Sequence, residues 1–130
     1  AAQELDDFLE TERCLVEMND ILKNTTKSPL QSWMKGIIER IRARLLFKQN
    51  DYKGSNQAYE LSIENLQEAV GLEILIAKFR VLYAQSLVEQ GRLAHAENQL
   101  LMAHEIFKKM RNMTWMNKVE ELRITMNAAR

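Results

Sequence analysis

Apolar side chains recur at three- and four-residue steps along most of this chain, the spacing that lines one face of an α-helix. The pattern predicts six helices. Their expected ranges are 3–22, 29–48, 52–70, 72–90, 93–110 and 114–128. No stretch alternates apolar and polar residues with the period of two that indicates a half-buried strand. The sequence therefore predicts an all-α fold.

Residues that suit helix ends stand at the expected boundaries. Ser28 precedes Pro29 and is expected to cap the second helix, and Thr114 is expected to cap the sixth. Asn50 and Gly91 suit the left-handed conformation in which many helices end. The expected loops are about two to seven residues long, so neighbouring helices are expected to run antiparallel.

The middle helices repeat at a 41-residue step. One helix pair carries small and large residues in the order that is typical of a tetratricopeptide pair: Ala84, Leu87, Gly91, Ala96, Leu100 and Ala103. The corresponding earlier residues are Ala43, Leu46, Asn50, Ser55, Tyr59 and Ser62. Small side chains let two helices approach closely, so we expect Ala84, Ala96 and Ala103 to be buried at helix contacts.

The repeat defines the expected organisation of the chain. We interpret residues 1–130 as a single tetratricopeptide-like superhelix. Its parts are a lone B helix (3–22), two AB repeats (29–70 and 72–111) and a C-terminal helix (114–128). The 41-residue step exceeds the 34 residues that are standard for this repeat class.

Two phrases suggest a family. Leu-Val-Glu-Gln-Gly-Arg-Leu at 87–93, and Glu-Ile-Phe-Lys-Lys-Met at 105–110 followed by Trp115, accompany the lengthened repeat. Over residues 36–123 the chain resembles the tetratricopeptide-like region of LuxR-type bacterial transcription regulators. These are relatives of the maltose-regulon activator and of multi-domain signal-transduction ATPases. The resemblance implies a ligand- or partner-recognition segment of a larger cytoplasmic signalling or transcription regulator. No Walker motif or DNA-recognition helix occurs here, so the family's ATPase and DNA-binding functions are not carried over.

The overall charge and the single cysteine limit the function classes. Eighteen basic and eighteen acidic residues balance, which argues against direct nucleic-acid binding by this segment. One cysteine, Cys14, cannot form an internal disulfide and favours a reducing, cytoplasmic compartment. No apolar run reaches the roughly 18–20 residues of a membrane span. Acidic residues near the start of the chain predict no signal peptide.

A basic stripe, Arg40, Arg44 and Lys48, is the main candidate binding feature. The three residues stand four apart and therefore share one face of the second helix. In tetratricopeptide geometry this face points into a concave groove, together with the matching face of the fourth helix. The candidate contacts there are Lys78, Val81, Gln85 and Glu89.

The ligand of this groove stays open at the level of sequence. A groove with three cations could hold a carboxylate or an acidic segment of a protein or peptide partner. The resemblance instead implies a small-molecule inducer. As a third alternative, the stripe is a solvated helix face that pairs with nearby acids.

No catalytic, cofactor-binding or metal-binding residue is predicted. His95 and His104 stand nine residues apart, which places them on opposite faces of one helix, so they cannot share a metal ion. No general base or orienting acid accompanies Cys14 in the sequence, and we interpret it as a structural thiol. The chain is therefore expected not to be an enzyme.

The remaining conspicuous residues are two tryptophans and a group of methionines. We interpret Trp33 and Trp115, which begin two helices, as covers for the ends of the core. Five methionines gather toward the C-terminus: Met102, Met110, Met113, Met116 and Met126. They favour a surface that meets a further repeat, and self-association through the repeat ends is a second expectation.

Overall fold

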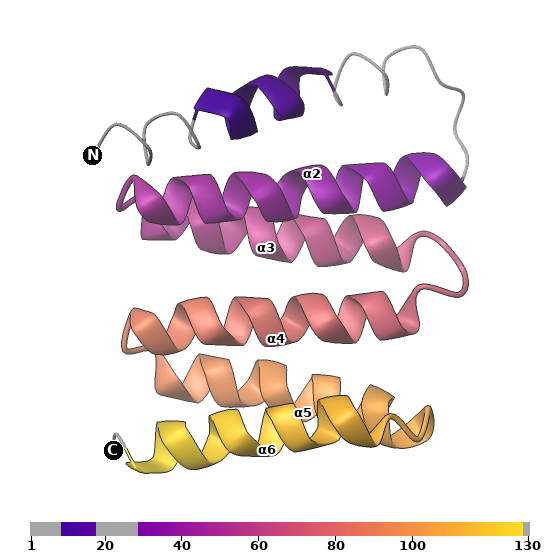
Figure 1. The fold of residues 1–130 in the computed structure, drawn as a ribbon, viewed down its shortest axis with the longest axis vertical. Coiled ribbons are helices and arrows are strands. Elements are labelled where there is room, and N and C mark those ends of the chain that lie inside the picture. The colour runs from indigo at the N-terminus through magenta and orange to yellow at the C-terminus, as the bar shows by residue number, and fades with distance from the viewer. Residues whose placement is uncertain (1–8, 18–28, 129–130) are drawn as a thin grey trace. The chain divides into compact units, whose positions relative to one another are not determined.

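The computed structural model describes residues 9–17 and 29–128. Within these ranges the chain contains six helices and no strand, and 87% of the described residues are helical (Figure 1). Residues 9–17 belong to the first helix. The others are α2 (Pro29–Lys48), α3 (Tyr52–Gln67), α4 (Glu73–Glu89), α5 (Leu93–Lys109) and α6 (Met113–Ala128). The predicted all-α class with six helices is confirmed.

Helix ends agree with the sequence except at two places. Helix α3 ends at Gln67, three residues earlier than expected. Asn112 rather than Thr114 caps α6, because its side-chain oxygen accepts a hydrogen bond from the Trp115 N–H at 3.2 Å. The expected cap at Ser28 and the ends of the first predicted helix lie outside the described residues.

Three turns share one hydrogen-bond pattern. In each, a backbone N–H donates to the carbonyl five residues earlier, at 2.9, 2.9 and 2.8 Å; the donors are Asp51, Arg92 and Asn112. The residue before each donor has a positive φ: 64° at Asn50, 77° at Gly91 and 55° at Arg111. This is the Schellman arrangement, which satisfies carbonyls at a helix end. The predicted left-handed ends at Asn50 and Gly91 are confirmed.

The chain forms two compact units, residues 1–69 and 70–130, and each is described by itself. In the first unit α2 packs against α3. The Ser55 hydroxyl donates to the Ala43 carbonyl at 2.7 Å, and the Ser62 hydroxyl donates to the Gly36 carbonyl. Residue numbers rise along α3 as they fall along α2, so the two helices are antiparallel (Figure 1).

The helical segment 9–17 packs on a different face of α2. Leu15 joins Ile38 and Leu45 in one buried apolar cluster. Ile38 stands two residues after Gly36, about half a helical turn around α2, so this cluster lies away from α3. Helix α2 is therefore covered on two faces, and a third face is left to carry the basic stripe.

In the second unit α5 packs against both α4 and α6. Ala84, Ala96 and Ala103 are each fully buried, so their predicted burial is confirmed. The small and large positions of the two units correspond at the 41-residue step: Ser55 and Ser62 are buried in the first unit, as Ala96 and Ala103 are in the second. Serine differs from alanine at these places because its hydroxyl can bond to the α2 backbone.

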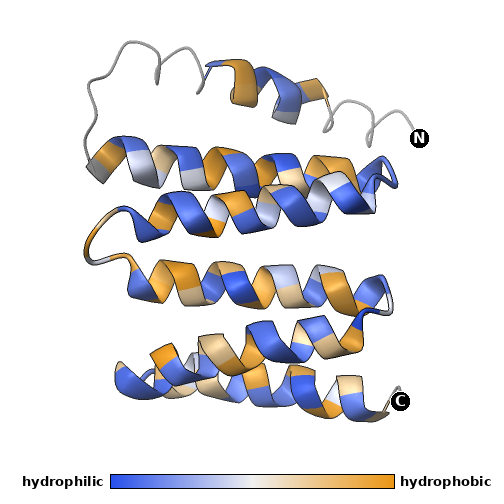
Figure 2. Ribbon diagram, turned by 180° about the vertical axis from the view of Figure 1, so that it is seen from behind, coloured by the Kyte–Doolittle hydropathy of each residue, from blue (hydrophilic) through white to orange (hydrophobic). Residues whose placement is uncertain are grey.

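Each helix mixes apolar and polar residues along its length (Figure 2). None of the helices in the described ranges is both long and apolar enough to cross a membrane.

Candidate recognition groove on α2

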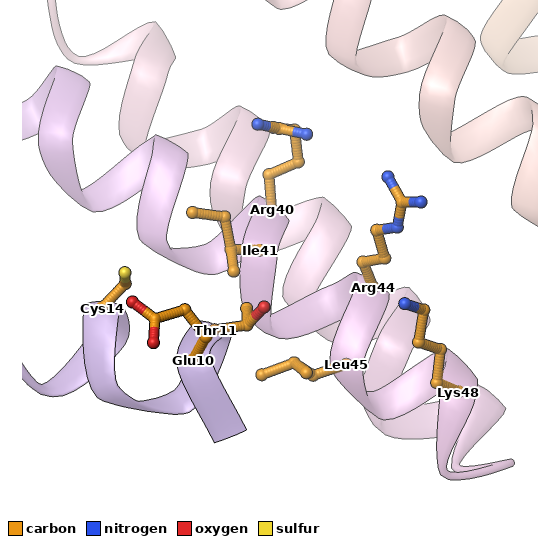
Figure 3. A pocket seen from close by; sticks show the side chains of 8 residues that line it. All are labelled: Glu10, Thr11, Cys14, Arg40, Ile41, Arg44, Leu45 and Lys48. Atoms are coloured by element: carbon orange, nitrogen blue, oxygen red, sulfur yellow. The ribbon is translucent and has the colours of Figure 1, made fainter. Parts of the chain in front are cut away.

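A groove of about 430 Å³ lies between the helical segment 9–17 and α2. We call it the α2 groove. Its lining consists of Glu10, Thr11, Cys14, Arg40, Ile41, Arg44, Leu45 and Lys48. All three residues of the predicted basic stripe are therefore brought together at one site (Figure 3). The stripe borders a hollow of the surface.

The helical period explains how α2 supplies both cations and an apolar floor. Arg40, Arg44 and Lys48 are separated by about 6 Å of helix rise at each step. Ile41 and Leu45 each follow an arginine by one residue, about 100° around the helix, and they point toward the segment 9–17 (Figure 3). The side of the groove nearer the segment 9–17 is therefore apolar, and its other edge is cationic.

Segment 9–17 supplies the opposite wall of the groove. Glu10, Thr11 and Cys14 line it, while Leu15 points into the cluster with α2. Glu10 is the single acid among the lining residues, and its carboxylate is bonded by Arg13 of the same segment. The sequence does not predict that segment 9–17 forms this wall, because the wall depends on which face of α2 the segment covers.

Two of the three cations of the basic stripe, Arg44 and Lys48, are not paired with an acid within the described part of the chain. Among the described residues, neither Arg44 nor Lys48 forms an ion pair, and both are exposed. Arg42 of the same helix pairs with Glu39 at 3.3 Å, on a different face. Like charges four residues apart on a helix repel one another by about 0.2–0.5 kcal/mol. A bound anion would relieve that repulsion.

Cys14 is exposed and stands at the wall of the α2 groove. The sequence suggests a structural thiol, but its neighbour Leu15 rather than Cys14 is the buried residue. The histidines lie on α5 of the other unit, where the His95 ring meets the Tyr83 ring edge-on at 5.3 Å. Within the described part of the chain, no group of three or more His, Cys, Asp or Glu residues could hold a metal ion.

The second unit contains a cleft of about 370 Å³ between α4 and α6. Val81 and Gln85, two of the four candidates on α4, line it, although Val81 is only 3% exposed. Glu89 is exposed but lines neither hollow. The sequence does not indicate the contribution of α6: Trp115, Lys118, Glu121, Leu122 and Thr125. A single groove shared by the α2 and α4 candidates stays a prediction.

Trp115 holds the three helices of this unit together. Its ring stacks on Phe107 of α5 at a centroid distance of 5.5 Å. The ammonium groups of Lys78 on α4 and Lys118 on α6 lie 5.3 and 4.4 Å from the ring centroid. The interpretation of Trp115 as a cover over the core agrees with these contacts, and Lys78 is engaged in this cation–π contact.

A polar contact links α4 and α5. Arg80 donates to the side-chain oxygen of buried Gln99 at 2.9 Å. Burial lowers the pKa of the Arg80 guanidinium from its ordinary value. Because Arg80 contacts a neutral amide rather than a carboxylate, we interpret it as a residue that helps α4 pack against α5.

Comparisons with protein-family models, with curated proteins and with solved structures found no match. Any function must therefore be argued from the site itself.

Proposed function

We propose that this chain is a non-catalytic recognition module that holds a protein or peptide partner in the α2 groove. The observation that carries the proposal is the combination of a cationic edge, Arg40, Arg44 and Lys48, with an apolar floor, Ile41 and Leu45. The partner segment would carry carboxylates next to apolar side chains.

Electrostatics favour an acidic partner. Three cations line the α2 groove against one acid, Glu10, which Arg13 already engages. Charge-assisted hydrogen bonds from guanidinium groups to carboxylates are stronger than neutral ones. Complementary charge also speeds encounter with an acidic partner, and this effect weakens as salt rises.

The openness of the α2 groove favours a peptide over a small inducer. Four of the lining residues are exposed: Glu10, Cys14, Arg44 and Lys48. Small-molecule sites usually enclose most of the ligand's surface, which requires walls on several sides. A chain segment can instead lie along the length of an open groove. The apolar floor is well placed to take one of its apolar side chains.

The wider setting that we propose is the one implied by the resemblance in sequence. The chain would be the tetratricopeptide-like recognition segment of a cytoplasmic signalling or transcription regulator. Support comes from the burial of small residues at the same places in both helix pairs, such as Ser62 and Ala103, one 41-residue step apart. The inducer-sensing alternative belongs to the same setting and differs only in the ligand.

A peptide library tests the proposal while the partner itself is unidentified. Random peptides displayed on phage are selected on the immobilised chain, and an enriched peptide is synthesised with a fluorescent label. We expect acidic and apolar residues side by side in the enriched sequences. Affinity should fall at least about tenfold in Arg44→Glu, a loss of about 1.4 kcal/mol.

Arg42→Glu is the matched control, because it changes the net charge equally on another face of α2. It should bind the peptide like the unaltered chain. Circular dichroism of both variants checks that they fold. Enriched peptides without acids, or equal affinity in both variants, would contradict the proposal.

A further inference from the structure

A second stripe with the spacing of the basic stripe and the opposite charge runs along α3. Glu60, Glu64 and Glu68 follow one another at four-residue steps, with Glu68 as the C-cap residue of α3, and all three are exposed. We call them the acidic stripe. Arg40 and Glu60 already have interaction partners within the chain, so the residues available for a further contact are the other members of the two stripes. In the described ranges, neither Glu64 nor Glu68 forms an ion pair.

The two stripes also match in the position of an apolar side chain. Leu61 stands three residues before Glu64 and is 43% exposed. Ile41 stands three residues before Arg44 and lines the α2 groove. Charges in both stripes are separated by about 6 Å of helix rise. A helix with the α3 pattern can therefore bring carboxylates to the cations and a leucine to the groove floor.

We propose that the α2 groove of one copy of this chain holds the outer face of α3 of a second copy. Arg44 and Lys48 would meet Glu64 and Glu68, and Leu61 would pack over the groove floor. This inference rests on the proposed function, because it names a partner for the same groove. It differs from the self-association through repeat ends that the sequence suggests.

The two stripes point in different directions, which determines the form of the assembly. Ser55 of α3 bonds to Ala43 of α2, so these residues mark the facing sides of the two helices. Glu64 stands nine residues after Ser55, half a turn around α3, and Arg44 is about 100° around α2 from Ala43. The contact is therefore heterologous, and copies join head to tail.

Analytical ultracentrifugation of the 130-residue chain tests the association. At about 0.01 M salt, where the screening length is about 30 Å, the mean mass should rise above the monomer with concentration. At about 1 M salt, with screening within about 3 Å, it should return to the monomer. A chain that stays monomeric at both salt concentrations overturns the inference.

Charge reversal identifies the surfaces. Arg44→Glu and Glu64→Arg should each be monomeric alone, since each breaks one side of the contact. A mixture of the two should associate again like the unaltered chain, because the unaltered groove of one variant meets the unaltered acidic stripe of the other, and the two reversed charges also attract each other. The double variant should associate again, and Arg42→Glu should behave like the unaltered chain. A mixture that stays monomeric overturns the inference.

The outcome for self-association can be separated from that for peptide recognition. If the chain stays monomeric while the selected peptide still depends on Arg44, the second copy is not the partner and the proposed function stands. If neither peptide binding nor association responds to Arg44→Glu, both proposals fail.

Discussion

Gly36→Ala tests the contact that holds α2 against α3. Gly36 lies within α2, where replacing glycine by alanine ordinarily stabilises a helix by about 1 kcal/mol. Here an added methyl carbon would lie 2.5 Å from Cδ2 and 2.6 Å from Cγ of Leu66, and 3.2 Å from the carbonyl oxygen of Ser62. Leu66 is fully buried and cannot turn away. Overpacking of this kind costs about 1–3 kcal/mol.

The net expectation is a loss of about 1 kcal/mol in the free energy of unfolding, the overpacking cost less the gain in helix propensity. Urea unfolding followed by circular dichroism measures it. The same substitution in a Leu66→Ala background should instead stabilise by about 0.5–1 kcal/mol, because the two contacts below 3.0 Å are gone and only the milder one with the Ser62 carbonyl oxygen stays. Leu66→Ala itself costs about 2–5 kcal/mol. The Leu66→Ala variant and the double variant that also carries Gly36→Ala are therefore both measured in a stabilising osmolyte.

The sign change between the two backgrounds is the decisive feature. A Gly36→Ala variant that gains about 1 kcal/mol in the otherwise unaltered chain would behave like an exposed helical glycine. The close approach of α2 and α3 at Ser62 and Leu66 would then be wrong.

Three further predictions concern the turns and the second unit. Gly91→Ala should cost about 1 kcal/mol, because φ is 77° and nothing lies near the new methyl group, so the cost is conformational alone. Arg111→Gly should gain about 0.5–1 kcal/mol for the same reason at φ 55°. Thermal unfolding measures the change in stability of both variants. If the two variants changed stability in the same direction, the left-handed turns at Gly91 and Arg111 would be contradicted. Trp115→Ala should cost about 2–4 kcal/mol through its lost contacts with three helices, measured by urea unfolding; a loss below about 1 kcal/mol would contradict that role. Gln99→Leu should cost about 1–2 kcal/mol by leaving Arg80 without its acceptor, and an unchanged unfolding midpoint would count against that bond.

Features set by local geometry could be predicted from the sequence. The left-handed ends at Asn50 and Gly91 follow from residues that tolerate positive φ. The shared face of Arg40, Arg44 and Lys48 follows from the helical period alone. These properties do not depend on which helices pack together.

Features that depend on packing could not be predicted. Cys14 lines the α2 groove because Leu15 places the segment 9–17 on α2, a choice among several faces. The helical period predicts Val81 as a contact residue, but the close packing of α4 leaves it buried. Arg111 adopts a positive φ although its side chain gives no local signal for it. The backbone hydrogen bond of Asn112 to Phe107 supplies the reason.

An acidic partner segment can bind in the α2 groove only if this groove attracts anions. Cys14 is the only cysteine of the chain and lines the groove, so its reactivity reports on the local potential. Its rate with dianionic dithiobis(nitrobenzoate) is divided by its rate with uncharged dithiodipyridine, in the unaltered chain and in two variants.

At low salt, Arg44→Glu should lower this ratio by about five- to tenfold. If the dianion stands on the order of 10 Å from the altered side chain, a change of two unit charges in water is worth about 1–1.4 kcal/mol once screening at low salt is included. Arg42→Glu should change the ratio far less, and the difference between the variants should vanish at about 1 M salt. A ratio that is the same in the unaltered chain and in Arg44→Glu would contradict an anion-attracting groove, and with it the proposed mode of recognition.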